Sequence, residues 1–393
     1  MIKSIHLQNF FGFQDCTINL EKGENVLVGI NGSGKSNFFK ALRLLIAIEH
    51  PQSFYYIALS EYGGYDGMSN LQRSEYDPIE LTFIFDSANI LAGKSKGELI
   101  YHFTLNKVAG NASYTITESL SLKKGGSNPK ILLSFKDGNG KLIKEDEKEY
   151  DSHKNFVDRV PAISKLYSNK TGSPLERIKY FIEQIVFYEQ FSTNRYSPIR
   201  NSKATILADR LSYDGGNLSS LLQTMKATDR KTYSVISDAL SKVNDKFIDF
   251  DFIPTGSGNT ELQIREQNFI RPTPIHLISD GTLRFLCLMS ILYNPNRGTV
   301  VCIDEPELGL HPDMINTLYR AIEHAAETSQ VIISTHSPHL LDYFNLSNIH
   351  VFEKNEENAT VVKRYADSDF KGWYETFYPG QMWRAGDIGG NRW

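Results

Sequence analysis

The amino-acid sequence predicts an α/β fold built around a mostly parallel β-sheet. Residues 25–29 form an apolar run typical of a buried strand, which leads through a glycine-rich loop into a helical pattern over residues 37–48. In the last third of the chain, the apolar runs 299–303 and 330–334 flank a helical pattern over residues 314–327. Strands that alternate with helices in this way pair in parallel and are covered by helices.

The composition indicates a globular chain with a large core and no overall attraction for polyanions. The 393 residues are 40% hydrophobic and 12% aromatic, which is enough to bury a sizeable core. The 42 Lys and Arg residues face 46 Asp and Glu residues, giving a net charge of −4. Any contact with DNA must therefore come from a local basic patch.

The cysteines and the apolar stretches indicate a reducing, cytoplasmic location. Cys16, Cys287 and Cys302 are odd in number, far apart and set among apolar residues, so we expect free thiols and neither disulfides nor a zinc site. The first residues lack the basic head and apolar run of a secretory signal. No apolar stretch approaches the roughly 20 residues that span a bilayer, so we expect no membrane association.

The glycine-rich loop has the sequence pattern of a phosphate-binding loop. Residues 29–36 match G-x-x-x-x-G-K-[ST], between the strand and the helix that this motif requires. Inward-pointing N–H groups and the helix N-terminus create an anion site. We expect Lys35 to reach the β and γ phosphates of ATP and Ser36 to bind Mg²⁺. The residues predicted to hold the nucleotide are Gly29, Asn31, Gly32, Ser33, Gly34, Lys35, Ser36 and Asn37.

The middle of the chain predicts an antiparallel β subdomain followed by a helical insertion. Residues 79–143 alternate between apolar and polar residues and contain Gly and Asn turns, which favours hairpins. Residues 150–250 are more helical in pattern, with a break at 214–217 before a helix that begins near Leu218. We therefore expect three parts: a first lobe with the phosphate loop and the β subdomain (1–150), a helical insertion or lid (151–270), and a second lobe (271–393).

Two carboxylates follow the strand expected at residues 299–303. Asp304 and Glu305 lie at its C-terminal end, where open α/β sheets bind ligands. Asp304 suits the coordination shell of Mg²⁺. Glu305 points the other way along an extended chain and can orient and deprotonate an attacking water.

Three segments together resemble the heads of ABC-type ATPases of the RecF, SMC and OLD-like class. Residues 304–312, DEPELGLHP, resemble their Walker B and D-loop segment. Residues 277–284, LISDGTLR, are similar to their signature motif, with Asp280 where transporter subunits usually carry Gly. Residues 331–338, VIISTHSP, resemble their switch-histidine strand and loop. The resemblance covers residues 1 to about 50 and about 275 to 345 and implies a P-loop NTPase of the ABC-type head class.

The resemblance adds four residues to the predicted site. Ser279 and Gly281 begin a helix, a second anion site suited to the γ phosphate of a nucleotide held by another P-loop. His336 would sense the γ phosphate and hold the water. Gln190 is the candidate for the family's Q-loop glutamine, and the alternative is an ordinary surface glutamine.

A signature serine that caps the nucleotide of a neighbouring subunit implies a homodimer, or a higher homo-oligomer, formed through the ATP sites.

The tail, residues 380–393, resembles the end of bacterial ATPases from phage-defence gene pairs, and its Trp383 and Trp393 would dock on a partner or close the core. We expect an ATPase that regulates a separate effector, such as a nuclease, in antiviral defence. Residues 339–393 are too few for the nuclease domain of full OLD-like proteins.

Two other functions stay open. A RecF-like ATPase in DNA repair would bind DNA directly, and the basic residues Arg195, Arg200, Lys203 and Arg210 could contact its backbone or form a solvated face. A transport ATPase is disfavoured by Asp280 and by the long insertion between Lys35 and Ser279.

Overall fold

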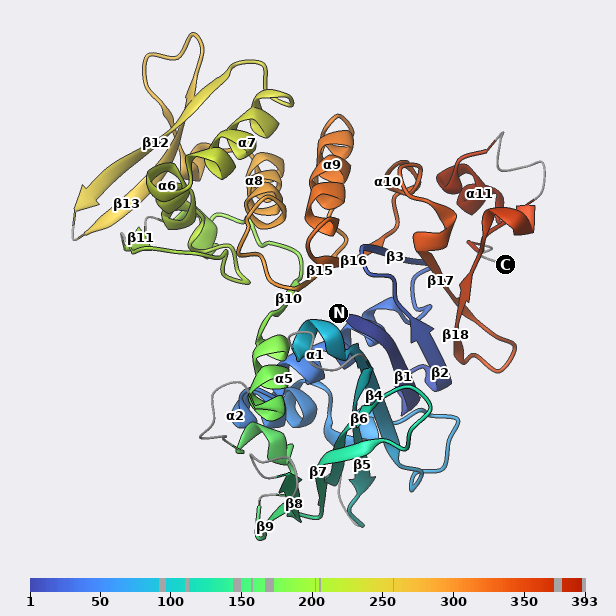
Figure 1. Ribbon diagram of the computed structural model, residues 1–393. Coiled ribbons are helices and arrows are strands. Elements are labelled where there is room, and N and C mark those ends of the chain that lie inside the picture. Colours follow the sequence, from blue (N-terminus) through green and yellow to red (C-terminus); the bar gives the residue numbers. More distant parts are fainter. Residues whose placement is uncertain are drawn as a thin grey trace.

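The computed structural model confirms the α/β fold and the mostly parallel central sheet (Figure 1). It describes residues 1–91, 97–109, 113–143, 150–156, 158–166, 173–201, 203–204, 206–256, 258–370 and 377–390. The central sheet has the strand order β10 (Ile185–Tyr188), β15 (Val300–Asp304), β16 (Gln330–Thr335), β3 (Glu24–Gly29), β17 (Ile349–Lys354) and β18 (Thr360–Arg364). The first five strands are parallel, and β18 pairs with β17 in the antiparallel direction.

The central sheet separates two hydrophobic cores, which explains the apolar runs within its strands. Successive residues of a strand point to opposite faces. Leu27 and Cys302 accordingly pack in one core, while Val28 and Val301 pack in the other. The first core also holds α1 (Lys35–Ala47) and α5 (Pro174–Glu183), and the second holds α6 (Leu218–Thr228), α7 (Arg230–Ser241), α8 (Asp280–Leu292) and α9 (Met314–Ala326).

The predicted antiparallel hairpins are present and belong to a larger sheet that includes the start of the chain. Its strand order is β2 (Phe13–Asn19), β1 (Ile2–Phe10), β4 (Ile79–Asp86), β5 (Glu98–Lys107), β6 (Tyr114–Lys123), β7 (Lys130–Lys136), β8 (Asn139–Ile143) and β9 (Tyr150–His153). Burial along β4 alternates strictly, because one face of the sheet packs on the first core. The short helices α2 (Pro51–Tyr56), α3 (Gly64–Met68) and α4 (Ser87–Ile90) lie in its connections.

The segment expected to be a helical insertion, residues 151–270, contains helices and also strands. Helix α6 begins at Leu218 as expected, after a turn in which Gly215 adopts a φ of +69°. The hairpin of β12 (Phe247–Gly256) and β13 (Asn259–Glu266) forms a third sheet with β11 (Lys203–Ala204) and β14 (Thr273–Pro274). The short apolar run 185–188 is a strand of the central sheet itself, since β10 pairs with β15.

The C-terminal elements and the cysteines are parts of the cores. Trp383, in α11 (Pro379–Ala385), packs in the second core close to α10 (Pro338–Leu341) and so closes that core, while Trp393 lies outside the described residues. Cys287 and Cys302 are buried free thiols, and Cys16 is a half-buried one. Within the described parts of the chain, no helix combines the length and apolar character needed to cross a bilayer.

Glu118 is a buried carboxyl group in the large antiparallel sheet. Its Oε2 accepts a hydrogen bond from Tyr101 Oη at 2.8 Å, and its Oε1 accepts one from the backbone N–H of Ile163 at 3.1 Å. Burial raises the pKa of Glu118 to about 7, and the hydrogen bonds only partly oppose that shift. The carboxyl group therefore ties the segment 158–166 to the sheet while retaining its proton to unusually high pH.

We predict that Glu118→Gln flattens the pH dependence of stability. The pKa in the folded state lies above the ordinary value of 4.5, so the stability contributed by the bound proton is present below that value and is lost as the pH rises through about 7. The contribution is on the order of 3 kcal/mol. Thermal unfolding between about pH 5 and about pH 8 should show a larger loss of stability in the wild type than in the variant. Glu356→Gln, at an exposed position, should keep the wild-type slope. Equal slopes in all three proteins would contradict the prediction.

Candidate active site

The predicted site residues follow strands that end at one edge of the central sheet. Asp304 pairs with Ser334, and Ser334 pairs with Leu27, so β15, β16 and β3 end close to one level. The loop 29–36 leaves β3 at this edge, and His336 follows β16 there. Such edges bind ligands in open α/β sheets because loops and helix N-termini converge on them.

The loop 29–36 is stabilised by a hydrogen bond from Thr360 in β18. Thr360 Oγ1 donates a hydrogen bond to the carbonyl of Ser33 at 2.9 Å, and the N–H of Thr360 donates to the carbonyl of Gly12 at 2.7 Å. Gly34 has a φ of +117°, and a Cβ there would lie 2.5 Å from Thr360 Oγ1. Glycine is therefore required at position 34 both by conformation and by space. Thr360 has no recognisable sequence signal, because it is far from the motif along the chain.

The described loop residues differ in exposure. Ser33 and Lys35 are buried, Asn37 is half-buried, and Asn31, Gly32 and Ser36 are exposed. Ser36, in the first turn of α1, thus presents its hydroxyl group at the loop surface.

Lys35 bends back onto its own loop. Its Nζ donates to the carbonyl of Gly29 at 2.7 Å and lies 3.4 Å from that of Ile30. Burial lowers the pKa of Lys35 to about 8, while the negative charges of three acids, first Glu305 and then Asp304 and Glu307, raise it. The lysine and these acids therefore share one electrostatic environment. A bound polyphosphate would supply further negative charge and favour the charged amine.

Ser334 joins the carboxylate of Asp304 to the backbone of Glu305. Ser334 Oγ donates to Asp304 Oδ1 and accepts from the backbone N–H of Glu305 at 3.1 Å. Glu305 has a left-handed φ of +47°, which costs a non-glycine residue about 1–2 kcal/mol and is typical of functional positions. The hydroxyl of Ser36 and the carboxylate of Asp304 are hard oxygen donors of the kind Mg²⁺ prefers alongside phosphate oxygens.

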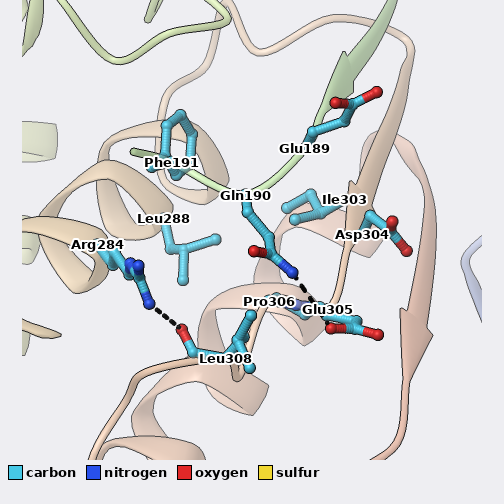
Figure 2. A pocket seen from close by; sticks show the side chains of 10 residues that line it. All are labelled: Glu189, Gln190, Phe191, Arg284, Leu288, Ile303, Asp304, Glu305, Pro306 and Leu308. Carbon is cyan, nitrogen blue, oxygen red and sulfur yellow. Dashed lines mark hydrogen bonds between the residues drawn. The ribbon is translucent and has the colours of Figure 1, made fainter. Parts of the chain in front are cut away.

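Glu305 lies between Gln190 and His336. Figure 2 shows the Gln190 side chain pointing towards Glu305, with Nε2 3.4 Å from Oε2. His336 Nε2 lies 3.5 Å from the other carboxylate oxygen, Oε1. Gln190 reaches this position because β10 ends at Tyr188, opposite Ile303. The side chain is exposed, but it is turned into the site; its role as a Q-loop glutamine stays a prediction.

Glu307 was not predicted as a site residue. Its Oε1 accepts from Thr335 Oγ1 at 2.6 Å and from the backbone N–H of His336 at 3.1 Å. Burial raises the pKa of Glu307. The side chain therefore fixes the loop that carries His336. Only its place in the 304–312 segment could have indicated it.

Ser279 and Gly281 lie on a different element from the loop. Ser279 caps α8, its Oγ accepting from the N–H of Thr282 at 3.2 Å. A Cβ on Gly281 would lie 2.9 Å from the carbonyl of Gly309, and Arg284 Nη1 donates to the carbonyl of Leu308 at 3.3 Å (Figure 2). Among the described residues, no hydrogen bond joins Ser279 or Gly281 to residues 29–37. The structure thus brings together Lys35, Asp304, Glu305, Gln190 and His336, and leaves Ser279 and Gly281 on the helix start.

The basic residues considered for DNA contact differ in availability. The side chain of Arg200 is only 9% exposed and is bound within the protein, so it is not free to contact DNA. Arg210 donates to Gln184, and Arg195 is exposed. The side chain of Lys203 lies outside the described part of the structure.

The chain is similar in sequence to several known proteins. Residues 25–342 match the family model described as "AAA domain, putative AbiEii toxin, Type IV TA system". The chain is 23% identical over 408 aligned positions to the Retron Ec83 probable ATPase of Escherichia coli, covering 91% of this chain and 72% of that protein. It is 22% identical to the OLD nuclease of Thermus scotoductus, covering 94% of this chain and 65% of the nuclease. A further match, 34% identical, covers 28% of this chain and 21% of the Retron Vc95 probable ATPase of Vibrio cholerae serotype O1 biovar El Tor.

Solved structures show the same fold at low sequence identity. An SMC head bound to the C-winged helix domain of ScpA has a TM-score of 0.57 and 12% identity, covering 94% of this chain and 99% of that one. An SMC head with an extended coiled coil, bound to the C-terminal domain of ScpA derived from Pyrococcus furiosus, has a TM-score of 0.56 and 11% identity. It covers 95% of this chain and 98% of that one.

We predict that Thr360→Val weakens ATP binding about two- to tenfold, the worth of one hydrogen bond to a loop carbonyl. Isothermal titration of a non-hydrolysable ATP analogue would measure the change in Kd. Thr228→Val is a matched control, because Thr228 Oγ1 also donates to a backbone carbonyl, that of Thr224, but lies on α6. Equal affinity in the Thr360 variant and the control would contradict a supporting role for Thr360.

Proposed function

This chain belongs to the AAA-domain family whose model it matches and is an ATPase of the AAA type, and we propose that it hydrolyses ATP in composite sites formed between two copies. We further propose that ATP-driven closure and opening of this pair regulates a separate effector, such as a nuclease, in defence against phage.

The observation that carries the proposal is the separation of two anion sites within one chain. Lys35 and the carboxylate cluster (Glu305 with Gln190 and His336) lie at the edge of the central sheet, whereas Ser279 caps α8. A helix N-terminus attracts an anionic group, and the hydroxyl groups of Ser279 and Thr282, 2.7 Å apart, lie at the start of α8. Because no hydrogen bond among the described residues links Ser279 to the loop of its own chain, a second copy is the natural source of the phosphate that it would cap. Two-fold symmetry then produces two equal sites.

In the proposed reaction, the loop and Lys35 bind the phosphates of ATP, with Lys35 exchanging its carbonyl partners for phosphate oxygens. Glu305 accepts the proton of the attacking water, and its position between Gln190 and His336 orients both carboxylate oxygens. His336 contacts the γ phosphate, and Glu307 holds the backbone of His336 in place. Mg²⁺, held by Ser36 and Asp304, would offset the charge of the phosphates.

Two observations support regulation of an effector. A groove with a volume of about 830 Å³ lies beside the site, and Gln190 forms part of its wall together with Arg43, Tyr56 and Tyr213. A partner bound there would contact the residue that touches Glu305. The relatives include proteins named as retron ATPases and OLD nucleases, which supports a defence role and an effector with nuclease activity.

We predict that Glu305→Gln lowers ATP turnover by about a hundredfold or more, because glutamine cannot accept the proton, yet leaves ATP binding intact. With ATP and Mg²⁺, light scattering should show a lasting dimer. Glu357→Gln, at an exposed position, serves as the control. Near-normal turnover in Glu305→Gln would show that Glu305 is not the general base.

The same variant, expressed with its genomic neighbours and purified with ATP, tests whether an effector binds to the chain. A nuclease that stays bound according to mass spectrometry supports the defence function. A dimer that retains only DNA favours a RecF-like ATPase.

We predict that Ser279→Arg and Lys35→Ala variants, each inactive alone, restore activity when mixed. A mixed dimer contains one site with both wild-type residues. Random pairing should therefore recover about a quarter of wild-type turnover, since about half of the dimers are mixed. A mixture that stays inactive would refute the composite site.

A further inference from the structure

Arg200 is bound to the segment that carries the predicted signature motif. It lies in a short 3₁₀ turn, Pro198–Arg200, ten residues after Gln190. Its Nη1 lies 3.2, 3.2 and 2.8 Å from the carbonyl oxygens of Ile275, His276 and Ile278. Its Nη2 donates to Asp280 Oδ1 at 2.5 Å. A single guanidinium group thus engages the chain on both sides of Ser279.

The other side of the same guanidinium faces the segment that follows Gln190. Its Nε donates to the carbonyl of Thr193 at 2.6 Å, and the Thr193 residue is buried. The Thr193 side chain also hydrogen-bonds Asp280, and together with Arg200 it holds the pKa of Asp280 below its ordinary range. Only arginine offers five N–H donors in a fixed plane, so lysine could not form this set of contacts.

The two segments joined by Arg200 serve different nucleotide sites of the proposed dimer. Residues 190–193 start at the carboxylate cluster, where Gln190 lies 3.4 Å from Glu305. Figure 2 shows Phe191 pointing away from Glu305, and this residue packs in the second core with α8. Residues 275–280 include Ser279, which in the proposed dimer faces the nucleotide of the other copy.

We propose that Arg200 is a positioning residue that joins two segments of its own chain. One segment carries Ser279, which is offered to the partner copy's nucleotide, and the other is residues 190–193, which begin at Gln190. This inference rests on the proposed composite site. It assigns Arg200 an effect in trans: its loss damages the site that contains the partner's Lys35 and leaves the half-site of its own Lys35 intact. Asp280, the residue that departs from the transporter pattern, is the anionic partner that holds the guanidinium in place.

Mixing experiments separate this role from the alternatives. Arg200→Ala alone should lower turnover about tenfold or more, the worth of lost charge-assisted hydrogen bonds. Mixing it with Lys35→Ala should recover activity, whereas mixing it with Ser279→Arg should not, since both variants then lack a competent signature segment. Recovery with Ser279→Arg would overturn the proposal in favour of a role in cis. Recovery with neither partner would overturn it in favour of a general folding defect. Arg200→Lys should behave as Arg200→Ala, and Arg195→Ala, on the same segment but exposed, should keep wild-type turnover.

A second measurement does not depend on the composite site. Hydrogen exchange of Arg200→Ala should be faster at the amides of residues 275–282 and unchanged in β15 and β16. Unchanged exchange at residues 275–282 would overturn the positioning role even if the Ser279→Arg and Lys35→Ala pair recovers activity. If that pair fails while exchange in this segment is faster, the composite site is refuted and the local ordering by Arg200 stands.

Discussion

Parallel pairing of β10, β15, β16 and β3 is the constraint on which the site depends. Each strand contains an apolar run because a hydrophobic core covers each face of the sheet, so the pairing register cannot slip without exposing buried side chains. The fixed register makes the strands end at one edge. Polar residues placed just after each strand then meet, although Lys35, Gln190 and Glu305 lie in distant parts of the chain.

This constraint also explains what could be predicted from the sequence. Strand runs, the glycine-rich loop and the acids after β15 are local signals, and their meeting follows from parallel topology. Thr360, Arg200 and Ser334 could not be assigned in the same way, because their importance comes from side chains that approach from elements distant in sequence. Residues 185–188 form a short apolar run in the sequence, but their membership of the central sheet depends on long-range pairing.

Asp280, which departs from the transporter pattern, forms an ion pair with Arg200 from a segment 80 residues away in the chain. A glycine at the start of α8 would leave the guanidinium without a counter-charge in a largely buried position, and unpaired charges are costly there. Arg200, considered from sequence alone, belonged to a scattered basic region that could have contacted DNA. Its contacts assign it instead to the interior. Charge composition along a chain therefore predicts partners poorly when the charged groups are bound internally.

The support that β18 provides to the phosphate loop has a consequence for how the protein is made. The loop leaves the ribosome long before the threonine that secures it, which lies 327 residues after Ser33, and before the strand β17 that pairs with β3. Gln330 likewise bonds to the backbone of Ile2. Contacts of such wide sequence separation form late, so a nascent chain has no finished nucleotide site. We therefore expect the ability to bind ATP to arise only after β17 and β18 have been synthesised.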